Sequence, residues 1–264
     1  MENEILKNGA EHMTIAVISD VHGNRQALEA VLEDVAKYDV NHIVNLGDIV
    51  GYGADPEWCV QAIKSVASIS ILGNHDVVAA GIQSIAGMNP VAITALVWTM
   101  DNVSEDSLKF LRGLSYLAYG PDSKMGYVHS SLPHPQDFGY LFRNERIEEH
   151  LAAQRSRIMF VGHSHLADCW STDGKKIFSA ITYRNGTVKF DLGRSDTDKS
   201  VVNVGSVGQP RDRDPRASYG LVEIEGAYLK ITNRRVEYDV ESAQRRIRQF
   251  NLPDSLAERL EDGK

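Results

Sequence analysis

The chain has 264 residues, of which 42% are hydrophobic and 24% are charged, and its formal net charge at pH 7 is -8. These values are typical of a folded protein with a hydrophobic core, and the negative charge argues against a surface that binds polymeric nucleic acid. No apolar run reaches about 18 residues, so no membrane-spanning helix is expected. With only Cys59 and Cys169, a disulfide framework is not expected, and the reducing cytoplasm is the default compartment.

Residues 1–13 are polar and lack the apolar segment of a secretory signal, so they are predicted to be a disordered leader. No proline-, glycine- or serine-rich linker, charge block or internal repeat divides the remainder. This predicts a single domain over residues 14–264, and a homo-oligomer of that domain stays open.

The N-terminal part of the chain repeats one pattern, in which an apolar run ends in polar, potentially coordinating side chains. The runs 14–19, 42–46 and 69–72 lead into Asp20-x-His22, Gly47-Asp48 and Gly73-Asn74-His75-Asp76. Apolar positions at three- and four-residue steps predict helices over 24–38 and 56–67 between these runs. Strand, helix and strand in this order indicate parallel strands, whose ends deliver functional groups to one edge of a sheet.

Two further helices are predicted within residues 89–114, broken near 101–104 with Ser104 as an N-cap. A short strand over 126–129 ends in His129, and a helix over 144–154 follows. A strand over 157–161 then runs directly into Gly162-His163-Ser164-His165. The two histidines are expected to lie on an extended segment and to point the same way.

Beyond residue 165 the pattern changes to hairpins. Asp173-Gly174 and Asn185-Gly186 are typical turns between short strands, and a further hairpin is expected to join residues 219–224 to 227–232. Residues 240–260 predict two amphipathic helices separated by Pro253. The whole pattern predicts an α/β protein with two packed sheets.

Seven side chains are candidate metal ligands because they follow predicted strands and offer carboxylate, amide or imidazole groups. Such mixed ligands suit Mn, Fe, Co, Ni or Zn rather than Cu(I) or calcium. Seven are too many for one tetrahedral ion but suit two ions that share a bridging carboxylate. The candidates are Asp20, His22, Asp48, Asn74, His129, His163 and His165.

In this order, the motifs Asp20-x-His22, Gly47-Asp48, Gly73-Asn74-His75-Asp76, His129 and Gly162-His163-x-His165 resemble those of the calcineurin-like metallophosphoesterases. The resemblance spans residues 14 to about 165, and residues 203–211 resemble a downstream segment of a small bacterial and archaeal branch. It implies a four-layer α/β/β/α sandwich, in which two packed mixed sheets are flanked by helices. It also implies a metal-dependent hydrolase of small phosphate esters or nucleotides.

The resemblance implies a division of labour within the site. One metal takes Asp20, His22, Asp48 and His165, and Asp48 bridges to a second metal with Asn74, His129 and His163. A hydroxide held between the metals, Mn first among the candidates, attacks phosphorus in line. The implied catalytic residues are Asp48 and His75, and His75 hydrogen-bonds a phosphate oxygen or protonates the leaving group. Asn24 and Arg211 are candidate substrate contacts.

Departures from the family pattern bear on the substrate. Serine/threonine protein phosphatases and diadenosine tetraphosphate hydrolases carry an arginine-glycine pair shortly after Gly-Asp, where this chain has Gly51-Tyr52-Gly53. Gly51 also stands near the place of the aspartate that partners the catalytic histidine in protein phosphatases. A phosphodiesterase is therefore favoured, with a diadenosine-polyphosphate hydrolase or a phosphomonoesterase as the alternative.

A non-catalytic scaffold is a further alternative, because the retromer subunit shares the implied fold. That subunit lacks the catalytic histidine, whereas this chain retains His75. Asp76 is expected to cap the following helix rather than to orient His75. A structural role is expected for the remaining histidines, which are His12, His42, His134 and His150.

Overall fold

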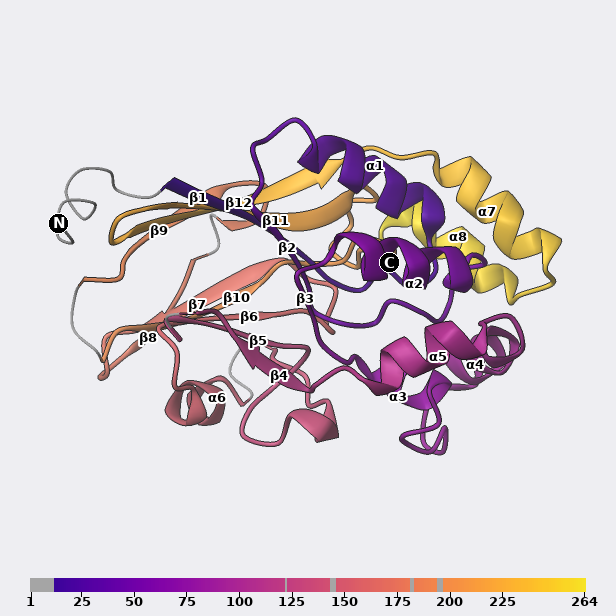
Figure 1. Ribbon diagram of the computed structural model, residues 1–264, viewed down its shortest axis with the longest axis horizontal. Helices are drawn as coiled ribbons and strands as arrows, with labels where there is room; N and C mark the ends of the chain where they lie inside the picture. The colour runs from indigo at the N-terminus through magenta and orange to yellow at the C-terminus, as the bar shows by residue number, and fades with distance from the viewer. Residues whose placement is uncertain (1–11, 122, 143–145, 181–182, 194–196) are drawn as a thin grey trace, which may run out of the picture.

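The computed structural model describes residues 12–121, 123–142, 146–180, 183–193 and 197–264. Two six-stranded sheets pack against each other, and helices lie on their outer sides (Figure 1). Most of the predicted leader lies outside the described residues. His12 and Met13, which were assigned to that leader, form the start of strand β1 (His12–Ile18).

The first sheet holds the three strands that lead into the polar motifs. β1 pairs in parallel with β2 (His42–Asn45), which pairs in parallel with β3 (Ile69–Ser70), as predicted. The sheet order is β3-β2-β1-β11-β12-β9, where the added strands are β11 (Ala217–Glu225), β12 (Tyr228–Val236) and β9 (Thr187–Asp191). Because β1, β2 and β3 are parallel, the motifs that follow them meet at one edge of the sheet.

The second sheet carries the other histidine motifs. Its order is β4 (Leu117–Tyr119), β5 (Met125–Val128), β6 (Ile158–Val161), β10 (Lys199–Asn203), β7 (Asp168–Thr172) and β8 (Ile177–Ser179). β5, β6 and β10 are parallel, and the remaining pairings are antiparallel. His129 therefore follows β5 and His163 follows β6 at the same end of this sheet.

One of the predicted hairpins is wrong. Asp173-Gly174 does join the antiparallel pair β7 and β8, and Glu225-Gly226 joins β11 and β12. Asn185-Gly186 forms a turn, in which the Gly186 N–H donates to the Tyr183 carbonyl at 3.0 Å, but the strands on either side belong to different sheets. A turn sequence specifies a local chain reversal and not the pairing partner, which for β9 is the distant strand β12.

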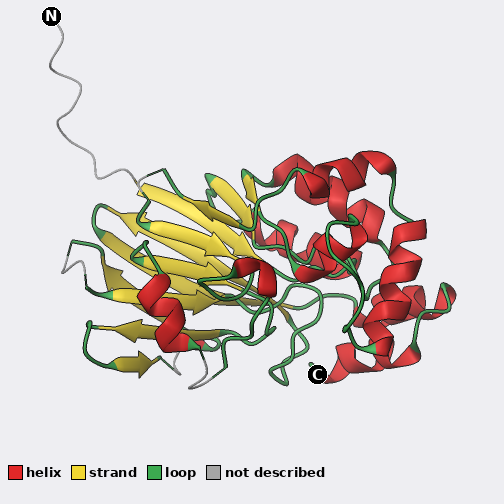
Figure 2. Cartoon of the chain, turned by 90° about the horizontal axis from the view of Figure 1, so that it is seen from below, coloured by secondary structure: helices red, strands yellow, loops and turns green. Residues whose placement is uncertain are grey.

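The helices gather mainly at one end of the two sheets (Figure 2). They are α1 (Arg25–Val35), α2 (Pro56–Val66), α3 (Asn74–Ala79), α4 (Pro90–Asp101), α5 (Glu105–Arg112), α6 (Ile147–Ala153), α7 (Val240–Gln249) and α8 (Asp254–Asp262). Ser104 caps α5 as predicted, because its hydroxyl accepts from the Ser107 N–H. Residues 144 and 145 of the predicted helix 144–154 lie outside the described residues. In the described part of the chain, no helix is both long and apolar enough to cross a membrane.

Apolar side chains alternate between the faces of each sheet and define the layers. On β1, Ala16 and Ile18 face helices α1 and α2, whereas Ile15 and Val17 face the second sheet. The outer face of the second sheet is covered by α6, whose Ile147 packs with β5 and β6 residues. These three clusters confirm the implied four-layer α/β/β/α arrangement of two mixed sheets.

A buried polar network ties α1 to the first sheet. The Tyr219 hydroxyl of β11 donates to Asp34 of α1 at 2.9 Å, and Arg234 of β12 donates to the same carboxylate at 3.1 Å. Burial would raise the pKa of Asp34, but hydrogen bonds from Tyr219, Lys37 and Arg234 lower it below its ordinary value. The carboxylate is therefore a charged anchor between a helix and two strands.

Replacing Tyr219 by phenylalanine tests this anchor. Because the hydroxyl bonds a charged group, Tyr219→Phe should lower the free energy of unfolding by about 1.5–3 kcal/mol. Urea denaturation gives the value, and the same substitution in an Asp34→Ala background should cost much less. An unchanged urea midpoint for Tyr219→Phe would show that the bond is not stabilising.

Candidate metal centre

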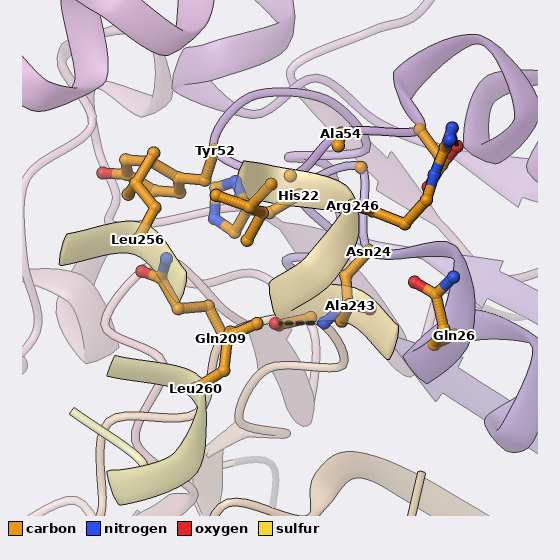
Figure 3. Close-up of a pocket in the computed structure, with 15 residues that line it drawn as sticks. His22, Asn24, Gln26, Tyr52, Ala54, Gln209, Ala243, Arg246, Leu256 and Leu260 are labelled. Carbon is orange, nitrogen blue, oxygen red and sulfur yellow. Dashed lines mark hydrogen bonds and ion pairs between the residues drawn. The ribbon is translucent and has the colours of Figure 1, made fainter. Parts of the chain in front are cut away.

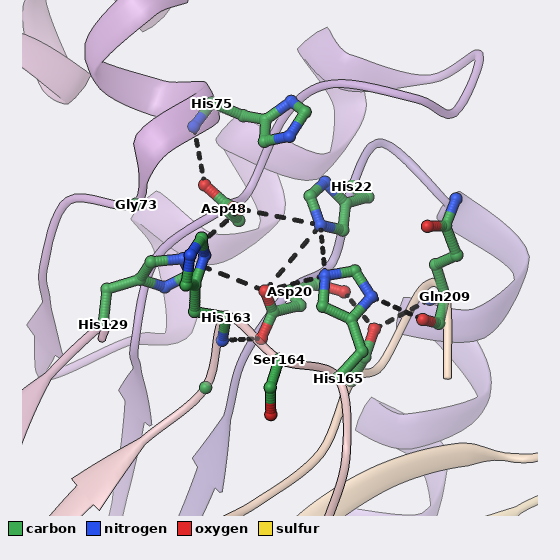
Figure 4. A network of polar contacts seen from close by, with 12 residues as sticks. Asp20, His22, Asp48, Gly73, His75, His129, His163, Ser164, His165 and Gln209 are labelled. Carbon is green, nitrogen blue, oxygen red and sulfur yellow. Dashed lines mark hydrogen bonds and ion pairs between the residues drawn. The ribbon is translucent and has the colours of Figure 1, made fainter. Parts of the chain in front are cut away.

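The six predicted carboxylate and imidazole ligands come together in one buried cluster where the ends of both sheets meet α3 (Figure 4). The seventh predicted ligand, Asn74, lines the adjoining cleft with Asp48 and His163. The six carboxylate and imidazole ligands are at most 6% exposed, and Asn74 is partly buried. They come from the loops after β1, β2, β5 and β6 and from the first residue of α3. Parallel strands in two sheets therefore deliver all five motifs to one place.

One group of three ligands has the spacing of a metal site. The Nε2 atoms of His22 and His165 are 3.1 Å apart, and Asp20 Oδ1 lies 3.2 Å from His165 Nε2 and 3.7 Å from His22 Nε2. Ligand atoms that each sit about 2.0–2.2 Å from one ion lie roughly 3–4 Å from one another. The three atoms therefore converge on a position that a divalent ion would fit.

A second group lies beside the first and shares Asp48 with it. Ligand atoms of Asp48, His129 and His163 lie within 4.8 Å of one another, and Asp48 Oδ2 is 3.3 Å from His129 Nε2. The same carboxylate oxygen is 3.6 Å from His22 Nε2 in the first group. Asp48 thus lies where a bridging ligand between two ions would lie.

Backbone N–H groups from other motifs hold both carboxylates in place. Asp20 Oδ2 accepts from the His163 N–H at 3.0 Å, and Asp48 Oδ1 accepts from the His75 N–H at 2.8 Å. In each carboxylate one oxygen is therefore bonded to the protein, and the other faces the imidazoles. This division leaves Asp20 Oδ1 and Asp48 Oδ2 available to ligate a metal ion.

Backbone carbonyl groups orient three of the imidazoles. The Nδ1 atoms of His22, His129 and His165 lie 3.2, 2.8 and 2.6 Å from the carbonyl oxygens of Val50, Leu46 and Gln209, respectively. A hydrogen bond to a carbonyl requires the proton on Nδ1, which leaves the Nε2 lone pair directed into the cluster. Metal-binding histidines are typically held in this way.

Several buried atoms of the cluster have no hydrogen-bond partner within the described protein, namely Asp20 Oδ1, Asn74 Oδ1, His129 Nε2 and His163 Nε2. Buried polar atoms are rarely left unsatisfied, because each lost hydrogen bond is costly. Divalent cations would satisfy all four atoms, and the mixture of carboxylate, amide and imidazole suits Mn, Fe, Co, Ni or Zn. The residues present therefore fit a two-metal site.

The protonation of the histidines agrees with this assignment. Burial lowers the pKa of His163 to about 3 and that of His22 well below its ordinary value, so both are neutral ligands. His129 differs because burial, which lowers its pKa, is outweighed by Asp48 together with Asp20 and the Leu46 carbonyl, which raise the pKa to about 9. A metal ion binding at His129 would displace that proton.

The backbone of the ligand loops is strained. Positive φ angles occur at five of the seven ligands, Asp20 (54°), His22 (50°), Asp48 (53°), His163 (64°) and His165 (60°). The segment with His163 and His165 is therefore not extended as predicted but turns twice through the left-handed region. Such conformations cost non-glycine residues on the order of 1–3 kcal/mol each and are held only by the surrounding structure.

Two glycines make room for the site. A Cβ atom on Gly73 would lie 2.1 Å from Asp48 Oδ1, and one on Gly51 would lie 2.3 Å from His75 Nδ1. Gly73 has a φ of -97°, so it is needed for space rather than for an unusual backbone turn. Gly51 has a φ of +88° and sits directly against the imidazole of His75. By the resemblance, protein phosphatases carry near this position the aspartate that partners their catalytic histidine.

His75 lies beside the ligands and lines the adjoining cleft. Its ring centroid is 4.5 Å from that of Tyr52 and 4.8 Å from that of His22, and burial lowers its pKa to about 4. Its Nδ1 atom is buried and has no hydrogen-bond partner within the described protein. The cleft has a volume of about 380 Å³, and Asp48, His75 and Arg211 line it together.

Asp76 joins two motif loops, as well as capping α3 as predicted. Its Oδ2 accepts from the Gly73 N–H at 3.1 Å, and its Oδ1 accepts from the N–H groups of Ile49 at 2.9 Å and Val50 at 3.2 Å. Burial and then the neighbouring Asp48 raise its pKa to about 7. Its contacts hold the loop that carries Asp48 rather than the His75 side chain.

Asn24 caps helix α1 and holds it to the loop that contains Gly208. Its Oδ1 accepts from the Ala27 N–H at 3.1 Å as the N-cap of α1, and its amide donates to the Gly208 carbonyl at 2.8 Å (Figure 3). The cavity beside it and His22 measures about 10 Å³, which is room for about one water molecule. The Asn24 amide is thus already bonded within the protein, and its predicted contact with the substrate stays a prediction.

Two tyrosines that the sequence analysis did not identify line the cleft. The Tyr140 ring stacks on that of His163 with centroids 4.1 Å apart, and Tyr52 packs on His75 and His22. Tyr140 lies in an irregular loop, where no periodicity marks it. The Gly51-Tyr52-Gly53 sequence was the one available signal for Tyr52.

Among the four histidines assigned structural roles, His150 is buried and its Nδ1 accepts from the Leu132 N–H at 3.1 Å.

Glycine and alanine substitutions separate backbone strain from metal binding. His165→Gly and His165→Ala both remove a ligand, but in chelator the glycine variant should be more stable by about 1 kcal/mol, because glycine tolerates positive φ. His129 does not have a positive φ, so there the alanine variant should be more stable than the glycine variant by about 0.5–1 kcal/mol. Urea denaturation of the four variants measures both differences, and the same order at both positions would contradict the strain.

Comparison with known proteins agrees with this geometry. The model of the calcineurin-like phosphoesterase superfamily domain matches residues 13–227. An uncharacterized protein of Methanocaldococcus jannaschii is 36% identical over 248 residues, which cover 93% of this chain and 96% of that protein. The crystal structure of a metallophosphoesterase from Sphaerobacter thermophilus is similar with a TM-score of 0.81 and 36% identity, covering 96% of this chain and 100% of that one.

A hypothetical protein from Pyrococcus horikoshii shares the fold with a TM-score of 0.75 at 22% identity, covering 96% of this chain and 99% of that one. The family model covers most of the chain, including every predicted ligand. The chain therefore belongs to the calcineurin-like phosphoesterase superfamily, as its five motifs predict.

Proposed function

We propose that the protein is a dinuclear-metal phosphoesterase that hydrolyses small phosphate diesters or nucleotides. The observation that carries this proposal is the pair of ligand groups that share Asp48 at the side of a cleft. A ring nitrogen of His75 lies within 4.8 Å of a carboxylate oxygen of Asp48 and a ring nitrogen of His22. His75 is therefore close enough to act on a phosphoryl group bound there.

The roles of the side chains follow from their positions. Two divalent ions, with Mn²⁺ as the first choice, would supply Lewis acidity to the phosphoryl group and would acidify a water molecule into the neutral range. Asp48 holds both ion positions, and His75 hydrogen-bonds a phosphoryl oxygen or protonates the leaving group. Arg211 lines the same cleft, where its guanidinium would bind an anionic oxygen of the substrate.

The size of the cleft favours an ester with groups on both sides of phosphorus. A volume of about 380 Å³ is within the range of sites for small organic ligands and is far larger than a phosphate ion needs. Tyr52 and Gly51 occupy the segment in which protein phosphatases and diadenosine tetraphosphate hydrolases carry an arginine. A diester is therefore favoured over a dinucleoside polyphosphate or a monoester.

A catalytic role is favoured over a scaffold, because His75 is retained and its Nδ1 is unpartnered within the described protein. Both cysteines are free and buried, which supports the cytoplasm as the compartment. A homo-oligomer is compatible with this proposal and does not alter the site.

Metal removal tests the proposed centre. Protein treated with a chelator should lose hydrolysis of bis(p-nitrophenyl) phosphate, because the four buried acceptor atoms would no longer hold an ion, and added Mn²⁺ should restore it. A colorimetric assay with parallel metal analysis measures both steps. Full activity in excess chelator would refute the two-metal proposal. A panel of monoesters, diesters, cyclic nucleotides and dinucleoside polyphosphates would then rank the substrates.

The His75 side chain can be tested apart from the metals. In His75→Ala the backbone N–H that holds Asp48 remains, so the metal content should be unchanged. Turnover should fall by about 10²–10⁴-fold, the usual contribution of a positioned acid or base. Metal analysis and kcat on the same preparation separate the two effects. If the variant lost its metals instead, His75 would be a ligand.

A further inference from the structure

A second group of polar side chains lies directly beside the metal centre and is centred on Gln209. The Gln209 carbonyl accepts from Nδ1 of the ligand His165 at 2.6 Å. The side-chain oxygen of the same glutamine accepts from two guanidinium groups, Arg211 Nη2 at 2.8 Å and Arg259 Nη1 at 3.2 Å. One residue therefore links a predicted metal ligand to two arginines.

The two arginines lack a negatively charged partner. Within the described residues, no carboxylate forms an ion pair with Arg211 or Arg259, whereas Arg234 and Arg246 each pair with an aspartate. The buried Nε of Arg259 also has no hydrogen-bond acceptor there. Burial, and then the charge of Arg211, lower the pKa of Arg259. Two neighbouring cations that share one neutral oxygen would be stabilised by an anion.

Arg211 places one end of this pair at the substrate cleft. Arg211 lines the cleft with His75 and His165, and its guanidinium carbon lies 5.9 Å from the centroid of the Tyr52 ring. Gln209 and Leu256 of α8 line a small cavity to which Tyr52 also contributes (Figure 3). An anion held by both arginines would therefore lie at the edge of the cleft and not on the metal positions.

Anchoring of α8 does not by itself explain Arg259. Leu256, Ala257 and Leu260 of this helix are buried in an apolar cluster with α4 and α7, so packing already holds the helix. Arg259 also lies beyond residues 13–227, which the family model matches. The C-terminal helix thus adds a cation to a site whose metal ligands all lie within the family domain.

We infer that Arg211 and Arg259 form an anion subsite that binds a second phosphate group of the ester substrate, next to the phosphate that is hydrolysed. The inference rests on the proposed phosphoesterase function. Guanidinium groups bind phosphate through paired charge-assisted hydrogen bonds, and two of them can hold a terminal phosphate from two sides. The preferred substrate is then a phosphorylated diester, such as a nucleotide ester that carries a further phosphate on its sugar.

Two chromogenic diesters that differ by one phosphate test the subsite. They are the p-nitrophenyl ester of thymidine 5′-phosphate and the same ester with a 3′-phosphate. The full-length protein loaded with Mn²⁺ should prefer the phosphorylated ester by at least about tenfold in kcat/KM, since two charge-assisted hydrogen bonds are added. Arg259→Gln should reduce this preference to less than about twofold. Arg213→Gln removes an equal charge from an exposed position of the neighbouring loop and should keep the preference.

The possible results separate the inference from the function beneath it. If wild type shows no preference, or if Arg259→Gln lowers kcat/KM for both esters equally, the arginine pair is only structural. If wild type hydrolyses neither ester, the proposed function fails on these substrates. Calorimetry still tests the subsite in that case, because thymidine 3′,5′-bisphosphate should bind at least about tenfold more tightly than thymidine 5′-phosphate, and Arg259→Gln should remove the difference. Equal affinities in wild type would overturn the inference. Thermal unfolding of each variant confirms that it is folded.

Discussion

The candidate metal centre depends on two backbone hydrogen bonds that cross between motifs. The His163 N–H holds one oxygen of Asp20, and the His75 N–H holds one oxygen of Asp48. Each bond joins loops that are far apart in the sequence and directs the free carboxylate oxygen toward the imidazoles. The ligand positions are therefore coupled, because a shift of either loop would turn a carboxylate away from its metal position. Ligands held by such supporting contacts keep their geometry before the metal binds.

Packing in the rest of the fold offsets the free energy that this strained and buried arrangement costs. Five ligands adopt positive φ angles, and their charged or polar groups are buried together. Both faces of β1 pack into apolar clusters, one with the helices and one with the second sheet. This packing holds the strand ends rigidly, so that the loops leaving them can remain strained. Asp76 adds to the support by tying the loop of Asp48 to the start of α3.

The inferred anion subsite would extend the site beyond residues 13–227, which the family model matches, into helix α8. Gln209 connects Arg259 of α8 to the predicted ligand His165. Its side-chain oxygen accepts from Arg259, and its backbone carbonyl accepts from His165 Nδ1. In the proposed function the metal ligands define where a phosphoryl group binds, whereas in the inferred subsite the arginines add charge at the edge of the cleft. In these two proposals the motif loops carry out the reaction, and Arg211 with Arg259 selects the substrate. His75 and Arg211 line the same cleft, so both functions act on one bound molecule.

The sequence by itself determined the three parallel strands, most helix positions and the candidate ligands that gather in one cluster, because apolar periodicity and motif order are local signals. It did not determine that Asn185-Gly186 connects two sheets, that His163 and His165 are left-handed, or that Asn24 serves as a cap bonded to Gly208. Pairing partners and backbone strain depend on contacts between distant segments. For the same reason, only the tertiary structure brought Tyr140 onto His163 and Arg259 beside Arg211, since nothing in the local sequence of Tyr140 or Arg259 marks its neighbour in space.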